Sequence, residues 1–214
     1  MPERKIIVKL NSTIVFTGDS ITDCNRGNPA YAPYGKGYVH FAANWLLARY
    51  PELSLNIINT GISGNTVRDL KGRWETDCLT FKPDVLSILI GINDCWRYSC
   101  DPARQDAVSP DEYETIYRHL LGQVRTNFDC QIVVMEPFLL CSDPRNPILT
   151  ELQNYIQIVR KLSAEFNTLL IPLQSLIDTA LRQVPPDKWS PDMVHPVTWA
   201  HAWLAQRWLE ITRI

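Results

Sequence analysis

Short apolar runs alternate along the chain with segments of helical periodicity. The runs are rich in β-branched side chains, as buried parallel strands are, and span residues 14–16, 53–58, 84–90, 131–136 and 168–172. Helical spacing of apolar positions covers residues 37–50, about 66 onward, 110–127, 147–166, 173–183 and 197–211. This alternation predicts a three-layer α/β/α sandwich, in which helices cover both faces of a central five-stranded parallel sheet.

Two local patterns refine this prediction. The run 84–90 is the most continuously apolar, so we expect it at the centre of the sheet. A long polar loop is predicted from Gly91 to about Ser109, where Ser-Pro-Asp-Glu marks the start of the helix over 110–127. The tryptophan- and alanine-rich helix over 197–211 either docks on the sheet or meets a second copy in a homo-oligomer.

Length and charge exclude several classes of protein. The 214 residues fit one domain, 1–214, and the net charge of −2 has no Lys/Arg block of the kind that binds nucleic acid. No apolar run approaches the ~18 residues of a membrane span, and the first residues lack the apolar core of a signal peptide, so we expect a cytoplasmic protein without a membrane partner. The six cysteines fit no zinc pattern. Cys95 and Cys100 are expected as free thiols, with a redox pair as the alternative.

Ser20 is the candidate nucleophile. It follows the first predicted strand, at the edge where open α/β sheets bind ligands, and Gly18 allows the sharp turn between them. A serine hydroxyl needs a base, a group that orients the base, and donors for an oxyanion.

His195 is the candidate base. The other three histidines, His40, His119 and His201, lie within predicted helices, whereas His195 lies in a proline-flanked loop three residues after Asp192. An aspartate at that spacing can accept the Nδ1 proton and leave Nε2 free to take a proton from serine. Taken alone, the pair is equally consistent with a structural role, in which Asp192 caps the last helix and His195 is a surface neighbour.

The oxyanion donors are expected from three predicted loops. They are the N–H of Ser20, the unobstructed N–H of Gly64 and the side-chain amide of Asn93. Taken singly, Gly64 and Asn93 are ordinary turn residues.

Four motifs that occur in one order favour catalytic roles for these residues over ordinary structural ones. Together the motifs resemble the SGNH hydrolases, also called the GDSL esterase/lipase family. They are Gly18-Asp-Ser20, Gly61-Ile-Ser-Gly-Asn-Thr66, Gly91-Ile-Asn-Asp94 and Asp192-Met-Val-His195. The resemblance implies that Ser20 is the nucleophile, that Gly64 and Asn93 complete the oxyanion hole, and that Asp192 orients the base His195. No cofactor or metal is implied.

Three other interpretations fit the sequence less well. A nucleophile elbow at Ser63 would need glycine at position 65, where the chain has Asn65. A non-catalytic flavodoxin-like binding module would not need both the Gly-Asp-Ser and the Asp-x-x-His motifs. Metal-dependent hydrolysis is disfavoured because the aspartates near the strand ends fall in separate loops without a histidine pair.

Residues 64–74 and 90–97 resemble acetylxylan esterases and related carbohydrate deacetylases. This resemblance implies a serine esterase that hydrolyses small acyl esters of carbohydrates, with xylo-oligosaccharide esters as the expected substrates. A lipolytic enzyme would need an apolar groove near Ser20, yet residues 21–34 and 97–112 are polar.

Aromatic and basic side chains near these motifs are candidates for sugar binding. Trp96, Tyr98 and Trp189 lie on predicted loops, where exposed rings can pack on sugars, whereas Trp45 and Trp74 are expected in the core. A further set of arginines either binds sugar hydroxyls or faces solvent: Arg26, Arg68 and Arg97.

Overall fold

A five-stranded parallel sheet forms the centre of the protein. The computed structural model describes residues 5–214, and its strands follow the order β2-β1-β3-β4-β5. The strands are β1 (Thr13–Gly18), β2 (Asn56–Asn59), β3 (Val85–Leu89), β4 (Gln131–Met135) and β5 (Leu169–Ile171). The predicted fold class is confirmed.

Strand β3 lies at the centre of the sheet, as its apolar sequence predicts. Every residue of β3 is buried, and it pairs with β1 on one side and β4 on the other. In this register Gly18 lies opposite Leu89, and Leu89 lies opposite Met135. The three central strands therefore end at one level, and the residues that follow them meet at one edge of the sheet.

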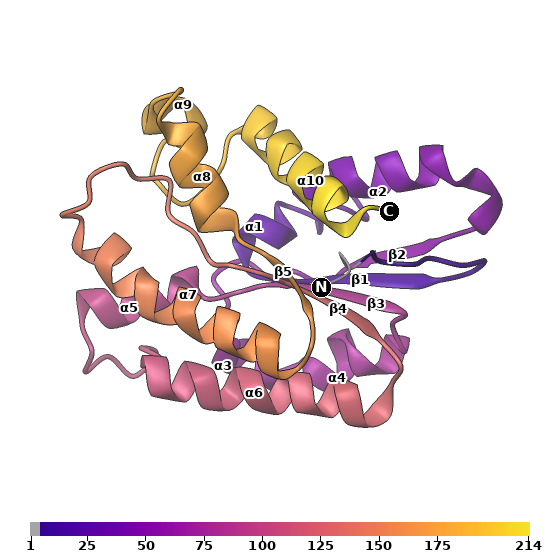
Figure 1. The fold of residues 1–214 in the computed structure, drawn as a ribbon, viewed down its shortest axis with the longest axis horizontal. Coiled ribbons are helices and arrows are strands. Elements are labelled where there is room, and N and C mark those ends of the chain that lie inside the picture. The colour runs from indigo at the N-terminus through magenta and orange to yellow at the C-terminus, as the bar shows by residue number, and fades with distance from the viewer. Residues whose placement is uncertain (1–4) are drawn as a thin grey trace.

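Helices cover both faces of the sheet. Figure 1 shows α1, α2, α8 and α10 on one face and α3 to α7 on the other. The bounds are α1 (Ser20–Asp23), α2 (Tyr38–Arg49), α3 (Val67–Gly72), α4 (Trp74–Asp77), α5 (Ile92–Cys100), α6 (Pro110–Asn127), α7 (Pro147–Glu165), α8 (Leu173–Leu181), α9 (Pro186–Trp189) and α10 (Thr198–Thr212), with 3-10 turns at Pro51–Leu53 and Leu79–Phe81. None of the helices within residues 5–214 is long and apolar enough to cross a membrane.

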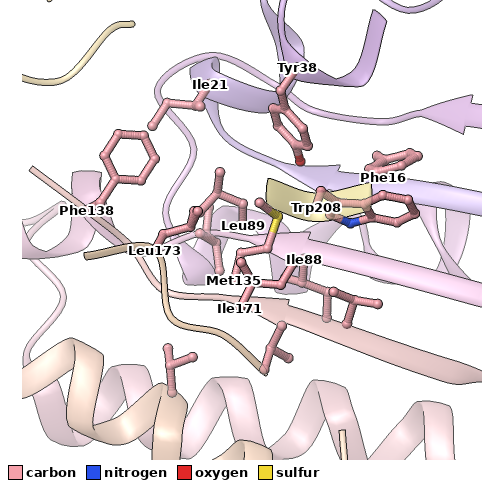
Figure 2. Packing of buried hydrophobic residues seen from close by; sticks show 14 of the residues in the cluster. Phe16, Ile21, Tyr38, Ile88, Leu89, Met135, Phe138, Ile171, Leu173 and Trp208 are labelled. Atoms are coloured by element: carbon pink, nitrogen blue, oxygen red, sulfur yellow. The ribbon is translucent and has the colours of Figure 1, made fainter. Parts of the chain in front are cut away.

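The last helix docks on the sheet beside α2. The ring of Trp208 lies 5.1 Å from that of Phe16, which in turn contacts the ring of Tyr38 (Figure 2). The indole N–H of Trp208 donates to Ser87 Oγ of β3 at 3.0 Å, so its polar atom is satisfied inside the core. Helix α10 therefore docks on the sheet, as the first of the two expectations for this helix states.

The predicted loop after β3 is wrong in its first half, because helix α5 occupies Ile92–Cys100. The helix begins directly after Gly91, whose φ of 132° turns the chain out of the strand. Ile92, Cys95 and Trp96 form a short inward face that packs near α7, while the other face is polar. The predicted start of α6 is confirmed: Ser109 caps it through the Glu112 N–H.

The two tryptophans expected in the core differ. Trp74 is buried at 2% exposure, as predicted, whereas Trp45 is 42% exposed and that prediction is wrong. Trp45 lies on the outer face of α2, where its ring contacts Tyr50 instead of the sheet.

Candidate active site

One hollow at the carboxyl edge of the sheet collects four of the predicted site residues. Ser20, Gly64, Asn93 and His195 all line it, and its volume is about 590 Å³. They come from the start of α1, the loop between β2 and α3, the start of α5 and the loop between α9 and α10. Residues up to 175 positions apart in the chain thus share one site.

The turn that presents Ser20 requires glycine before it. Gly18 has a φ of 155°, and a Cβ there would lie 2.0 Å from the carbonyl oxygen of Leu89. Asp19 then caps α1 by accepting the Ile21 N–H at 3.0 Å. The Ser20 hydroxyl lies 3.0 Å from Nε2 of His195, within hydrogen-bond distance.

The His195 ring is held by Asp192 on its other side. Nδ1 lies 2.7 Å from Asp192 Oδ2, while Oδ1 accepts the N–H groups of Val194 and His195 and the hydroxyl of Ser190. Burial alone would raise the pKa of the Asp192 carboxyl, but the hydrogen bonds from His195, Val194 and Ser190 hold the pKa well below its usual range. The carboxylate therefore stays charged and fixes the Nδ1–H tautomer.

This tautomer leaves the Nε2 lone pair directed at Ser20. The imidazole can accept the serine proton as Oγ attacks a carbonyl, and Asp192 stabilises the resulting imidazolium. The His195 side chain is 54% exposed, so a substrate can reach the Ser20 hydroxyl from solvent.

The three predicted oxyanion donors face the same hollow. Within residues 5–214, the N–H groups of Ser20 and Gly64 have no acceptor. Asn93 donates one amide hydrogen to the Asn65 carbonyl oxygen at 3.0 Å, which fixes the amide and leaves the second hydrogen available. Gly64 has a φ of 80°, and Arg97 donates to its carbonyl oxygen at 2.7 Å, so this peptide is held in place.

Arg73 holds the backbone around this site, and the sequence did not predict that role. Its guanidinium donates to the carbonyl oxygens of Gly18 and Thr60 at 3.0 and 2.6 Å, and to the Asn65 side chain at 2.7 Å. It also pairs with Asp77 at 2.8 Å. Arg73 thereby connects the ends of β1 and β2, although nothing in its local sequence distinguishes it from a solvent-facing arginine.

Ser63 lines the hollow but its hydroxyl is engaged elsewhere. Ser63 Oγ donates to Asp23 Oδ2 at 2.6 Å, and its N–H donates to the same oxygen at 3.2 Å. The Asp23 carboxylate thereby holds the loop of Ser63, whereas His195 contacts Ser20. The geometry therefore favours Ser20 over Ser63 as the nucleophile.

Two buried carboxyl groups lie behind the site. Asp19 and Asp94 are almost fully buried, and in each one carboxyl oxygen has no hydrogen-bond partner among the described residues. Burial raises the pKa of each to about 7, although backbone N–H groups, from Ile21 and Val67, partly oppose the shift. Both acids hold short loop segments of the site rather than the base.

The aromatic residues predicted to bind sugar do not line the hollow. The expectation of an exposed Trp189 ring is wrong: the side chain is 3% exposed and packs between Trp199 and Trp203. Trp96 and Tyr98 lie on helix α5 rather than on a loop, and both are partly buried.

The three candidate arginines all have partners in the protein. Arg68 forms a bidentate pair with Glu112, and Arg97 holds the Gly64 carbonyl. Arg26 donates through Nε to the Gly61 carbonyl oxygen at 2.6 Å.

All six cysteines are free. Cys95 and Cys100 are therefore unpaired, as expected, with Cys95 buried and Cys100 exposed. Among residues 5–214, no group of three or more His, Cys, Asp or Glu side chains is arranged to hold a metal ion.

A serine hydroxyl, an aspartate-oriented histidine and unpaired N–H donors at the carboxyl edge of an α/β/α sheet define a serine hydrolase of the acyl-transfer class. Residues 16–203 match the model of the GDSL-like lipase/acylhydrolase family, and the chain belongs to this family. The predicted family is confirmed, and the protein is a carboxylic ester hydrolase.

Similar proteins include an acetylxylan esterase from Geobacillus stearothermophilus, 38% identical over 201 residues, covering 92% of this chain and 91% of the relative. The crystal structure of the esterase Axe2 from that organism has a TM-score of 0.90 at 36% identity, covering 97% of this chain and 96% of the other. Three further structures of Axe2 are described as catalytic mutants, with a serine, an aspartate or a histidine replaced by alanine. LAE5, an alpha/beta hydrolase enzyme from the Lake Arreo metagenome, has a TM-score of 0.90 at 31% identity, covering 97% of this chain and 98% of the other.

Proposed function

We propose that this ester hydrolase removes acetyl groups from carbohydrates, with acetylated xylo-oligosaccharides as its substrates. The observation that carries the chemistry is the hydrogen-bonded series from Ser20 through His195 to Asp192, with distances of 3.0 and 2.7 Å. The similarity to an acetylxylan esterase over nine-tenths of the chain supports the substrate class.

The proposed reaction passes through an acyl-enzyme. His195 accepts the Ser20 proton as Oγ attacks the acetyl carbonyl, and the N–H groups of Ser20 and Gly64 with the Asn93 amide stabilise the oxyanion. His195 then protonates the leaving sugar alcohol. Water attacks the acetyl-enzyme with the same base, releases acetate and restores the hydroxyl of Ser20.

The lining of the hollow favours a short acyl group on a polar alcohol. Its polar side chains include Asn25, Lys36 and Ser63, whereas Ile21 and Val197 are its aliphatic side chains apart from prolines. Each buried methylene of a long acyl chain would contribute about 0.8 kcal/mol against an apolar surface, and apart from its prolines this hollow offers two aliphatic side chains for such contacts. A lipolytic esterase, the main alternative, requires a larger apolar groove.

Acetate release from acetylated xylo-oligosaccharides tests the proposal. The wild-type enzyme should release acetate and should prefer p-nitrophenyl acetate over the butyrate and octanoate esters in kcat/KM. The Ser20→Ala variant should be folded and inactive on all of them. Preference for the octanoate without sugar deacetylation would contradict the proposal in favour of lipolysis. Oligosaccharide binding without any ester turnover would instead support a sugar-binding module.

We further propose that the enzyme acts in the cytoplasm. Six free thiols, most of them buried, are typical of proteins kept in a reducing compartment. Fractionation of cells that produce the protein tests this, and recovery of the active enzyme from the medium would contradict it.

A further inference from the structure

A second hollow adjoins the active-site hollow beyond the end of α1. Its volume is about 550 Å³, and its lining includes Arg26, Gly27 and Ile62. Asn25 lines both hollows, and Ser63, which follows Ile62, lines the first. A ligand whose ester lies at Ser20 can therefore extend past Asn25 into the second hollow.

The second hollow is formed by two loops that are held rigidly against each other. A Cβ at Gly61 would lie 2.3 Å from the Asp23 nitrogen, so the loop after β2 lies directly on the end of α1. Arg26 Nε donates to the Gly61 carbonyl oxygen at 2.6 Å, and Asp23 accepts both donors of Ser63. A ligand would therefore meet a preformed surface and lose little free energy in ordering it.

The polar groups on this surface suit an uncharged ligand with hydroxyls. Within residues 5–214, the terminal nitrogens of Arg26 and the side chain of Asn25 form no hydrogen bond. Arg26 Nε also lies 3.8 Å from Asp23 Oδ1, so the guanidinium charge is balanced and an anion has no particular advantage. The free N–H groups of Arg26 and the NH2 group of Asn25 can donate to sugar hydroxyls, and the amide oxygen of Asn25 can accept from them.

We propose that the second hollow is a subsite for the neighbouring sugar unit of the acetylated chain. This proposal rests on the proposed deacetylation of xylo-oligosaccharides. Asn25 and Arg26 bind the hydroxyls of that unit, while the acetylated unit lies over Ser20. The two hollows have similar volumes, about 550 and 590 Å³, so each offers comparable space for one sugar unit.

Two substitutions test the subsite, and one matched control exists in the chain. Gly27 and Gly72 are both exposed, and a Cβ at either meets nothing within 4 Å. Gly27 lines the second hollow, so Gly27→Leu adds a side chain there, whereas Gly72→Leu adds the same side chain at the carboxyl end of α3, which lines neither hollow. Asn25→Gly removes the amide and tolerates the φ of 64° at this position.

The measurement is kcat/KM for acetylated xylotriose divided by kcat/KM for acetylated xylose. Gly27→Leu should lower this ratio about 10-fold or more, Asn25→Gly should lower it about 2- to 10-fold as expected for lost hydrogen bonds, and Gly72→Leu should leave it unchanged. Binding of unacetylated xylotriose to Ser20→Ala, with and without Gly27→Leu, provides a readout that is independent of turnover.

The outcomes separate the two proposals. If the wild-type enzyme releases acetate but neither the ratio nor xylotriose binding responds to Gly27→Leu, the subsite is refuted and the proposed function stands. If xylotriose binds and Gly27→Leu weakens it, but no acetate is released from either substrate, the subsite stands and the proposed function is refuted. Absence of both binding and acetate release overturns both.

Discussion

Replacement of Asp192 by asparagine isolates the orienting role of its carboxylate. Oδ2 lies against His195 Nδ1 at 2.7 Å, while Oδ1 accepts three donors, from Ser190, Val194 and the His195 backbone, at 2.8 to 3.0 Å. An asparagine amide must keep its oxygen toward those three donors, because the opposite orientation would point its NH2 group at them. The NH2 group of Asp192→Asn therefore faces Nδ1.

This orientation forces the wrong tautomer on the base. Nδ1 becomes an acceptor for the amide, so the proton moves to Nε2, which lies 3.0 Å from Ser20 Oγ and can no longer take the serine proton. The expected loss in kcat is about 10³- to 10⁴-fold, as for the same change in another Ser-His-Asp enzyme, and corresponds to about 4 to 5.5 kcal/mol of activation free energy.

The assay is kcat for p-nitrophenyl acetate at pH 8, with circular dichroism and Tm to verify folding. Asp187→Asn is the matched control, because Asp187 is exposed and pairs only weakly with Lys188 at 3.5 Å. It should retain wild-type kcat. A folded Asp192→Asn variant that loses less than about tenfold would refute the argument that the Asp192 carboxylate sets the His195 tautomer.

Three other predictions follow from the same contacts. Asn93→Ala removes a side-chain donor and should lower kcat about 10²- to 10³-fold with little change in KM; steady-state kinetics that show less than a tenfold loss would contradict its oxyanion role. Burial lowers the pKa of His201 from 6.5 to about 4, so between these pH values the unfolded chain binds a proton that the folded chain does not. The free energy of unfolding, measured with urea, should therefore fall by up to about 3 kcal/mol as the pH drops from about 6.5 toward 4. The His201→Gln variant should show a shallower decline. Burial raises the pKa of Asp94 from 3.8 to about 7, so the contribution of this group to folding is fully present below pH 3.8 and is lost as the pH rises from there through 7. The Tm of Asp94→Asn relative to that of the wild type should therefore be higher at pH 8.5 than at pH 5.5, and an unchanged difference would contradict the shift.

The sheet was predictable because its signals are local and repeated. Each strand is an apolar run between helical segments, and the unbroken apolar run of β3 indicated its central place. Parallel strands present their carboxyl ends at one edge, so residues just after β1, β2 and β3 were expected to meet. The structure brings Ser20, Gly64 and Asn93 together in that way.

Helix α5 and the Trp189 ring were mispredicted because their signals are weak or distant. The inward face of α5 consists of few residues, and the sequence Gly91-Ile-Asn at the start of this helix is typical of a turn. Trp189 is buried by Trp199 and Trp203 of α10, and whether a loop aromatic meets such partners depends on how two helices pack. Neither the ring's own neighbours in sequence nor its size indicates its exposure.

The proposed oxyanion hole depends on polar side chains that contact the backbone. Its donors come from the ends of three strands, and each must lie about 2.7–3.1 Å from a developing oxyanion. Arg73 holds the Gly18 carbonyl, Arg97 holds the Gly64 carbonyl, and Asn93 is fixed on the Asn65 carbonyl. Carbonyl acceptors occur at every residue, so sequence patterns cannot reveal such pairings, although these contacts fix the positions of the proposed oxyanion donors. The arginines near the motifs are therefore explained first by the loops they hold, and Arg26 alone among the three considered for sugar binding combines such a contact with free donors that face a hollow.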